Sequence, residues 1–100
     1  MYIRLGARGE PVLEEARDFG GFKVVVEGGE GAPLDERLAP CGRLDPDGCH
    51  AWIAERWLRA AGPAEPAWRE QLDAMLAYAD RKGWRDGAGA IRAHLETAGA

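Results

Sequence analysis

The segment from Pro66 to Lys82 constrains the fold most, because its apolar residues recur with the period of a helix. Proline is favoured at the first position of a helix, and Gly83 directly after the segment is typical of a C-terminal cap. The apolar residues at helical spacing are Trp68, Leu72, Met75, Leu76 and Ala79. We therefore expect a helix over 66–82 that buries one face, with Trp84 folding back on its last turn.

The rest of the core must be built from few large apolar side chains. Leucine, isoleucine, valine and phenylalanine together number 18 of the 100 residues. Four tryptophans add large buriable surfaces, and the net charge of −4 is small, so a folded chain is expected. At this length we expect one core and a single domain over residues 1–100.

Three segments have the composition of β-strands. Met1–Leu5 and Phe22–Glu27 are rich in β-branched or aromatic residues, and the second contains three consecutive valines that favour a pleated surface. Residues 90–96 alternate apolar and polar side chains. This alternation favours a strand, although the spacing of Ile91 and Leu95 also fits a terminal helix.

The segments between these strands are less regular. Residues 11–19 could form two helical turns before a pair of glycines, or remain irregular. Residues 34–38 could form a single helical turn. Residues 39–48 contain two prolines and two glycines, and we expect a loop there.

The middle of the chain supports two interpretations. It could form a short strand over Cys49–Ile53 followed by a helix over Ala54–Ala61, or one long helix from a cap at Asp45 to Gly62. We favour the strand and helix, because Gly48 would lie in the first turn of the longer helix. Together these elements predict an α+β fold, in which a small, mainly antiparallel sheet of about three to four strands carries two helices packed on one face.

The charge pattern argues against several classes of partner. Acidic and basic residues are interleaved, without the basic patch that phosphate groups require, so no nucleic acid is expected. No apolar run approaches the ~18 residues of a membrane span, and the first residues lack the pattern of a signal peptide. We therefore expect no membrane contact and a cytoplasmic location.

The missing residue types exclude some chemistry. The chain contains no serine and no asparagine, which removes serine-hydrolase catalysis, a GxxxxGK[ST] phosphate loop and N-glycosylation. The glycine-rich residues 28–31 follow a predicted strand, but no long helix begins directly after them and Glu30 would repel a phosphate. We expect a surface loop there.

His50 and His94 are the residues best suited to acid–base catalysis, since histidine has an unperturbed pKa near neutral pH. If both lie on strands, they could meet in the sheet, and Tyr78 or Asp86 could assist them. Neither histidine belongs to a motif, so the alternative is that both are ordinary surface or half-buried residues.

Cys41, Cys49 and His50 are candidates for a zinc or thiol site, with His94 as a fourth ligand. Seven residues separate the two cysteines, which is wider than the spacing of typical paired zinc ligands. We therefore expect no metal and no cofactor. The alternatives are a redox pair, or a buried Cys49 on the short strand with Cys41 on a loop.

The tryptophans are candidates for contact with a ligand or partner, because pockets and interfaces are enriched in this residue. The candidates are Trp52, Trp57 and Trp84. With so few other large apolar residues, the alternative is that tryptophan forms the bulk of the core.

These observations favour a non-catalytic accessory or interaction domain that acts as a homo-oligomer or as a subunit of a larger assembly. The first alternative is a small acid–base enzyme or ligand-binding protein with a pocket lined by tryptophan and histidine. The second is the thiol or zinc site at Cys41, Cys49 and His50.

Overall fold

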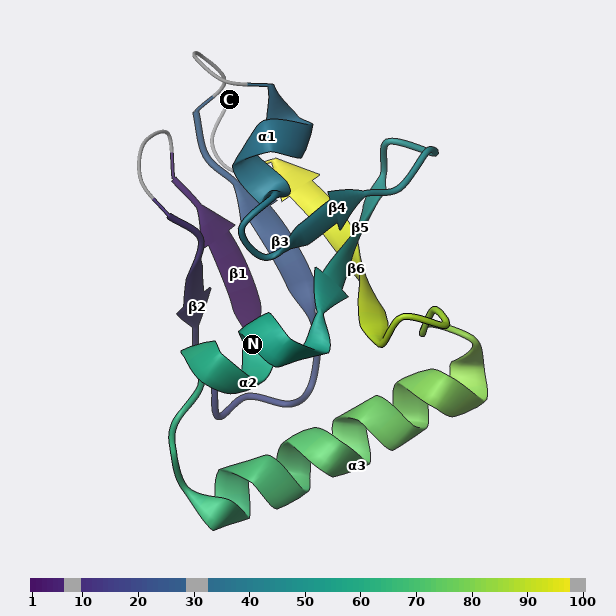
Figure 1. The fold of residues 1–100 in the computed structure, drawn as a ribbon. Helices are drawn as coiled ribbons and strands as arrows, with labels where there is room; N and C mark the ends of the chain where they lie inside the picture. Colours follow the sequence, from purple (N-terminus) through teal and green to yellow (C-terminus); the bar gives the residue numbers. More distant parts are fainter. Residues whose placement is uncertain (7–9, 29–32, 98–100) are drawn as a thin grey trace.

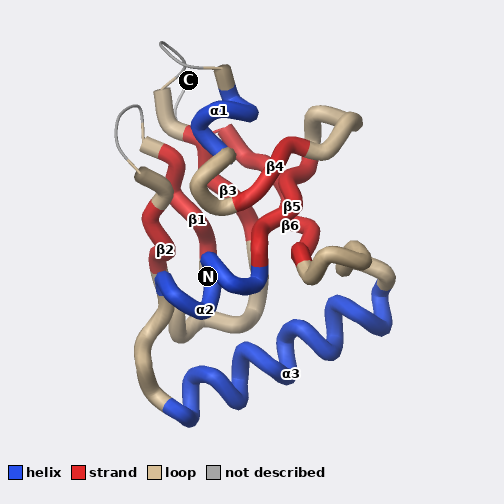
Figure 2. Tube along the Cα trace, viewed as in Figure 1, coloured by secondary structure: helices blue, strands red, loops and turns tan. Residues whose placement is uncertain are grey.

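The computed structural model describes residues 1–6, 10–28 and 33–97, which form six strands and three helices (Figure 1, Figure 2). In chain order these are β1 (Tyr2–Leu5), β2 (Val12–Glu14), β3 (Lys23–Val26), α1 (Leu34–Leu38), β4 (Gly42–Leu44), β5 (His50–Ala54), α2 (Glu55–Ala61), α3 (Pro66–Lys82) and β6 (Ala90–Thr97). The predicted α+β class is confirmed. The expected surface loop at residues 28–31 falls mainly on residues outside the described part.

The strands form one curled, mixed sheet with the order β2-β1-β3-β6-β5-β4. The central pairs β1/β3 and β3/β6 are parallel, whereas β1/β2, β5/β6 and β4/β5 are antiparallel. The prediction of three to four mainly antiparallel strands was therefore only roughly right. It missed the two edge strands, β2 and β4, and the parallel pairing at the centre.

Both missed strands are only three residues long and depend on their neighbours. In β2, Val12 pairs with Arg4 and Leu13 pairs with Ile3 of β1. These partners draw the segment into the sheet, so the two helical turns allowed for residues 11–19 do not form. Strands this short carry too few residues for a periodic pattern to be recognised.

β4 forms in a segment that was expected to be a loop. Gly42 pairs with Ile53 of β5, and a Cβ at Gly42 would overlap the backbone carbonyl of Trp52. Glycine at this position permits a close approach of the two backbones. The residue that indicated a loop is therefore what allows the strand to pair.

One face of the sheet packs on the core and the other carries the polar side chains. Because side chains alternate along each strand, Ile3, Val24, Ile53 and Ile91 lie on the core face. The helices α1 and α2 add Leu38 and Leu58, both fully buried. The helix α2 contacts both β5 and β2, which are far apart in the strand order, so it spans the opening of the curl.

The helix α3 begins and ends where the sequence predicts. Gly83 is left-handed (φ 77°), its N–H bonds to Asp80 O at 3.1 Å, and the N–H of Trp84 bonds to Ala79 O at 2.9 Å, which completes a Schellman cap. Figure 1 shows α3 crossing below one end of the sheet. The expectation of two helices was only roughly right, because the described residues form three helices, all of which add buried side chains to the same core.

The interpretation of 49–61 as a strand followed by a helix is confirmed by β5 and α2, and the interpretation of 90–96 as a strand is confirmed by β6. Within the described ranges, no helix is both long and apolar enough to cross a membrane.

Candidate functional site

A cavity of about 450 Å³ lies between the start of β5, the first half of β6, the segment leading into β3, and the C-terminal half of α3. One side is aromatic and apolar, and is formed by Phe19, Phe22, Met75, Tyr78, Trp84 and Ile91. The other side is polar, and is formed by His50, Arg92 and His94. The cavity therefore combines an apolar wall with a small set of polar groups, as ligand pockets do.

The antiparallel pairing of β5 and β6 brings the three polar groups together. His50 is the direct partner of His94, and their rings meet edge to face with centroids 5.5 Å apart. Arg92 lies two residues before His94 on the same face, and its Nη2 is 3.2 Å from His50 Nδ1.

Asp47 holds His50 from the turn between β4 and β5. Its Oδ1 accepts the backbone N–H groups of Cys49 (2.7 Å) and His50 (3.1 Å), and its Oδ2 lies 2.8 Å from His50 Nδ1. The N–H of Cys49 and the His50 ring together lower the pKa of Asp47 to about 2. An ionised carboxylate only accepts hydrogen bonds, so the shorter, 2.8 Å contact places a proton on Nδ1 and leaves Nε2 for other partners. Arg92 Nη2, 3.2 Å from the same Nδ1, is then a neighbour of the ring and not its hydrogen-bond donor.

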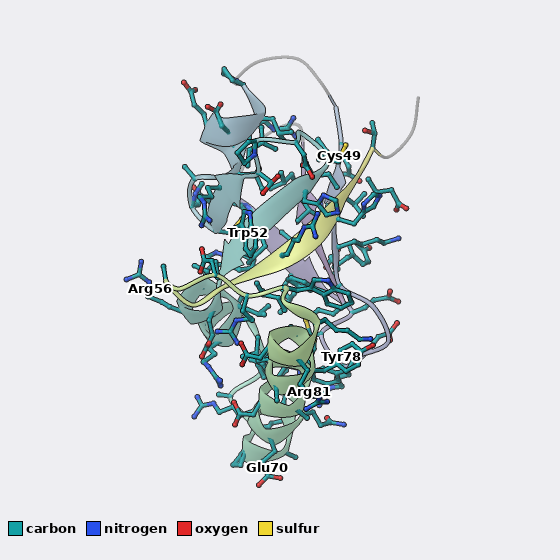
Figure 3. The ribbon with its side chains drawn as sticks, turned by 90° about the vertical axis from the view of Figure 1, so that its right-hand side faces the viewer. Cys49, Trp52, Arg56, Glu70, Tyr78 and Arg81 are labelled. Carbon is teal, nitrogen blue, oxygen red and sulfur yellow. The ribbon has the colours of Figure 1, made fainter. Side chains whose placement is uncertain are left out.

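The helix side of the cavity is positioned by the cap of α3. Trp84 donates its N–H to Ala79 O and accepts the N–H of Arg92 at 2.8 Å, so its backbone joins α3 to β6. Its ring meets Tyr78 edge to face with centroids 5.9 Å apart. Tyr78 and Trp84 remain 47% and 39% exposed, respectively, so their rings are available for contact. Figure 3 shows Tyr78 on the same side of the molecule as Cys49, the residue before His50, and Arg56 on the opposite side.

A second hollow, larger (about 770 Å³) but more open, continues from the cavity across β3 and β1. The two share Gly20, Gly21, Phe22 and His94. Lys23 lines only the second hollow, and its Nζ is paired with Glu96 at 2.8 Å. The first cavity is therefore the part with the aromatic wall.

The two cysteines lie at opposite ends of the β4–β5 hairpin. Cys41 precedes β4, accepts the N–H of Ala54, and is buried, whereas Cys49 precedes β5 and is exposed. The expectation of a Cys41 on a loop is confirmed, because Cys41 lies in the turn between α1 and β4. The expectation of a buried Cys49 on the short strand is wrong, because Cys49 is exposed and precedes β5. Both are free, and no group of three or more potential metal ligands occurs among the described residues. The structure therefore does not assemble the site considered at Cys41, Cys49 and His50.

The tryptophans divide between core and surface. Trp68 is buried, and its Nε1 donates to Ala16 O at 2.7 Å. Trp57 is partly buried against the core, and Trp52 donates its Nε1 to Asp45 at 2.7 Å. Of the candidate contact residues, Trp84 alone lines the cavity.

Sequence reasoning named both histidines and Tyr78 but missed Asp47 and Arg92. Asp86, considered as an assistant, instead accepts Ala90 N–H at 2.7 Å and pairs with Arg43. The spacing of Asp47 and His50 within a Pro- and Gly-containing turn is the local signal that could have identified their contact. Arg92 has no such signal, because only strand pairing brings it to His50.

Comparison of the chain with family models, with curated proteins and with solved structures found no match. The function is therefore argued from the cavity itself. The structure contains one chain, so the predicted role as a homo-oligomer or as a subunit of a larger assembly stays a prediction.

Proposed function

We propose that this protein binds a small molecule, with an apolar body and an anionic head, in the cavity between β5, β6 and α3. The observation that carries the proposal is that aromatic rings and the guanidinium of Arg92 line one cavity of about 450 Å³. This volume lies within the range of ~300–1,000 Å³ that is usual for small-molecule sites.

The charge of the polar side favours an anionic head. The Arg92 side chain is 36% exposed, and its Nη2 lies 3.7 Å from Asp47 Oδ2, which is too long for a hydrogen bond. The contacts with Asp47 and with His50 Nδ1 (3.2 Å) both involve Nη2, so among the described residues Nη1 and Nε keep their donors for a ligand. The planar fork of the guanidinium suits a carboxylate. His94 is exposed beside it and adds a further hydrogen-bonding group.

The aromatic side favours an apolar body on the same ligand. The rings of Tyr78 and Trp84 offer large, rigid surfaces with few rotatable bonds, so that covering them loses little side-chain entropy. Phe22, from the segment leading into β3, belongs to the same apolar wall.

A variant that fills the cavity tests the proposal. A Cβ at Gly21 would meet no atom within 4 Å, and Gly21 lines the cavity, so Gly21→Leu should occupy ligand space without straining the fold. Gly87→Leu is the matched control, because Gly87 is equally open and does not line the cavity.

The measurement is the titration of tryptophan fluorescence with small aromatic and aliphatic carboxylates, beginning with phenylacetate. We expect saturable binding by the natural chain and by Gly87→Leu, and binding about tenfold weaker or worse for Gly21→Leu, equivalent to ~1.4 kcal/mol. If none of these carboxylates binds, or if the two variants bind with equal affinity, the proposal is contradicted.

A further inference from the structure

We infer that His50 is a general base in this cavity, positioned by Asp47, and that its substrates are enolisable α-keto acids whose carboxylate is held by Arg92. The inference rests on the proposed function, because the same cavity must first bind the acid. Its evidence is the arrangement of these three side chains on and beside β5 and β6.

The contact between Asp47 and His50 determines which ring nitrogen can take a proton. Asp47 accepts the Nδ1 proton at 2.8 Å and is itself held by two backbone N–H groups, so the histidine is fixed in one tautomer and orientation. Nε2 then carries the free lone pair. A carboxylate that orients a histidine in this way also stabilises the imidazolium that forms when the histidine accepts a proton.

The charged and titratable groups beside His50 come from the preceding turn and from the neighbouring strand. Asp47 lies in the preceding turn, and Arg92 and His94 lie on the neighbouring strand. Lys23 is the strand partner of His94 on its other side and is paired with Glu96. Arg92 is thus the charged group in the cavity that is closest to His50 and can hold an anion.

The carboxylate of an α-keto acid would bind the guanidinium of Arg92, which lies beside the His50 ring. The carbon next to the keto group would then lie near the ring, and the apolar side chain of the acid would extend toward Phe22, Tyr78 and Trp84. Holding a C–H group next to a base converts proton removal into a step within one complex, which lowers the entropic cost of reaching the transition state.

The reaction needs no further reagent. His50 Nε2 takes a proton from the carbon beside the keto group, the C–H electron pair forms the C=C bond of an enolate, and the negative charge moves to the former keto oxygen. Arg92 stabilises that charge. Return of a proton from the imidazolium, after exchange with solvent, restores the ketone with a solvent hydrogen in place of the original one.

Exchange with heavy water tests the inference directly. Phenylpyruvate is incubated with the protein in D2O, and loss of its methylene signal is followed by proton NMR against a buffer blank. We expect exchange above the blank, falling by ~100-fold or more, or to the blank rate, in His50→Gln. Phenylacetone, which has the same benzyl ketone without the carboxylate, should exchange at the blank rate.

The matched control for Arg92→Gln is Arg56→Gln. Arg56 lies on α2, on the opposite side of the molecule from Tyr78, so its loss should leave exchange unchanged (Figure 3). Arg92→Gln should weaken phenylpyruvate binding and reduce exchange together, because it removes the anchor of the carboxylate.

Asp47 acts through His50 and is a positioning residue. Asp47→Asn should slow exchange by about tenfold or more while phenylpyruvate still binds, because the amide does not fix the Nδ1–H tautomer. Nitrogen NMR of the His50 ring should show the altered tautomer in this variant, which a merely structural role would not produce.

The outcomes separate the two proposals. Saturable binding of phenylpyruvate without exchange above the blank overturns the catalytic inference and leaves the proposed function standing. Failure of every carboxylate to bind overturns both. A loss of exchange confined to His94→Gln, with His50→Gln unaffected, overturns the assignment of the base to His50.

Discussion

His50 and His94 stand directly opposite each other on antiparallel strands, and their rings meet edge to face with centroids 5.5 Å apart. The pairing also places Arg92 on the same face, beside both rings. A slip of one residue between β5 and β6 would turn one histidine to the core face. The polar side of the cavity therefore depends on the register of these two strands.

Gly42→Ala should destabilise the protein, because the new methyl group would overlap the carbonyl of Trp52 in the paired strand. We expect the free energy of unfolding to fall by about 1–3 kcal/mol, as for other overpacked sites. Urea denaturation measures this change. Gly87→Ala is the control, because a Cβ there meets nothing within 4 Å, and its effect should stay within ~0.5 kcal/mol. Equal stability of the two variants would show that the backbones of β4 and β5 do not approach each other closely at Gly42.

Asp47 should contribute to stability in a way that is lost in acid. Its folded-state pKa, about 2, lies below the ordinary value of 3.8, so folding favours the ionised carboxylate. The contribution is present above about pH 4 and disappears as the pH falls from about 4 to about 2.

Urea denaturation of the natural chain and of Asp47→Asn, at several pH values, checks this prediction. The natural chain should be the more stable of the two near about pH 6, and the difference should shrink as the pH approaches about 2. A difference that is constant with pH would contradict the role of the Asp47 charge.

The two cysteines should react at very different rates with a thiol reagent. Cys41 is 1% exposed, and its burial raises the pKa of the thiol to about 11. The reactive thiolate is therefore both scarce and shielded from the reagent. Cys49 is exposed. We expect one thiol per native chain to react quickly and the second only on unfolding, with the fast reaction absent from Cys49→Ala. Fast reaction of both thiols in the native chain would contradict the placement of Cys41.

The strongly periodic and the strongly β-branched segments could be predicted from sequence. The helix at Pro66–Lys82 was recognised by its apolar stripe and its cap at Gly83, both of which act within a few residues. The three valines at 24–26 likewise indicated β3. By contrast, β2 and β4 owe their conformation to the strands beside them. The need for glycine at position 42 is visible only once Trp52 is known to lie in the paired strand.

Part of the candidate site could likewise be predicted from the sequence, and part could not. The identities of His50, His94 and Tyr78 drew attention to them because few residue types carry such chemistry near neutral pH. Their meeting, and the addition of Arg92, required the pairing of β5 with β6 and the passage of α3 below the sheet (Figure 1).

The sequence by itself determined the α+β class, the helix at 66–82, the order of β5 and α2, and the exclusion of serine-dependent chemistry. The tertiary structure decided the mixed sheet, the separation of Cys41 from Cys49, and the cavity. The physical reason is one of range. Caps, helical periods and β-branched runs act between near neighbours in the chain, whereas strand order, register and a pocket arise from contacts between residues that are distant in sequence.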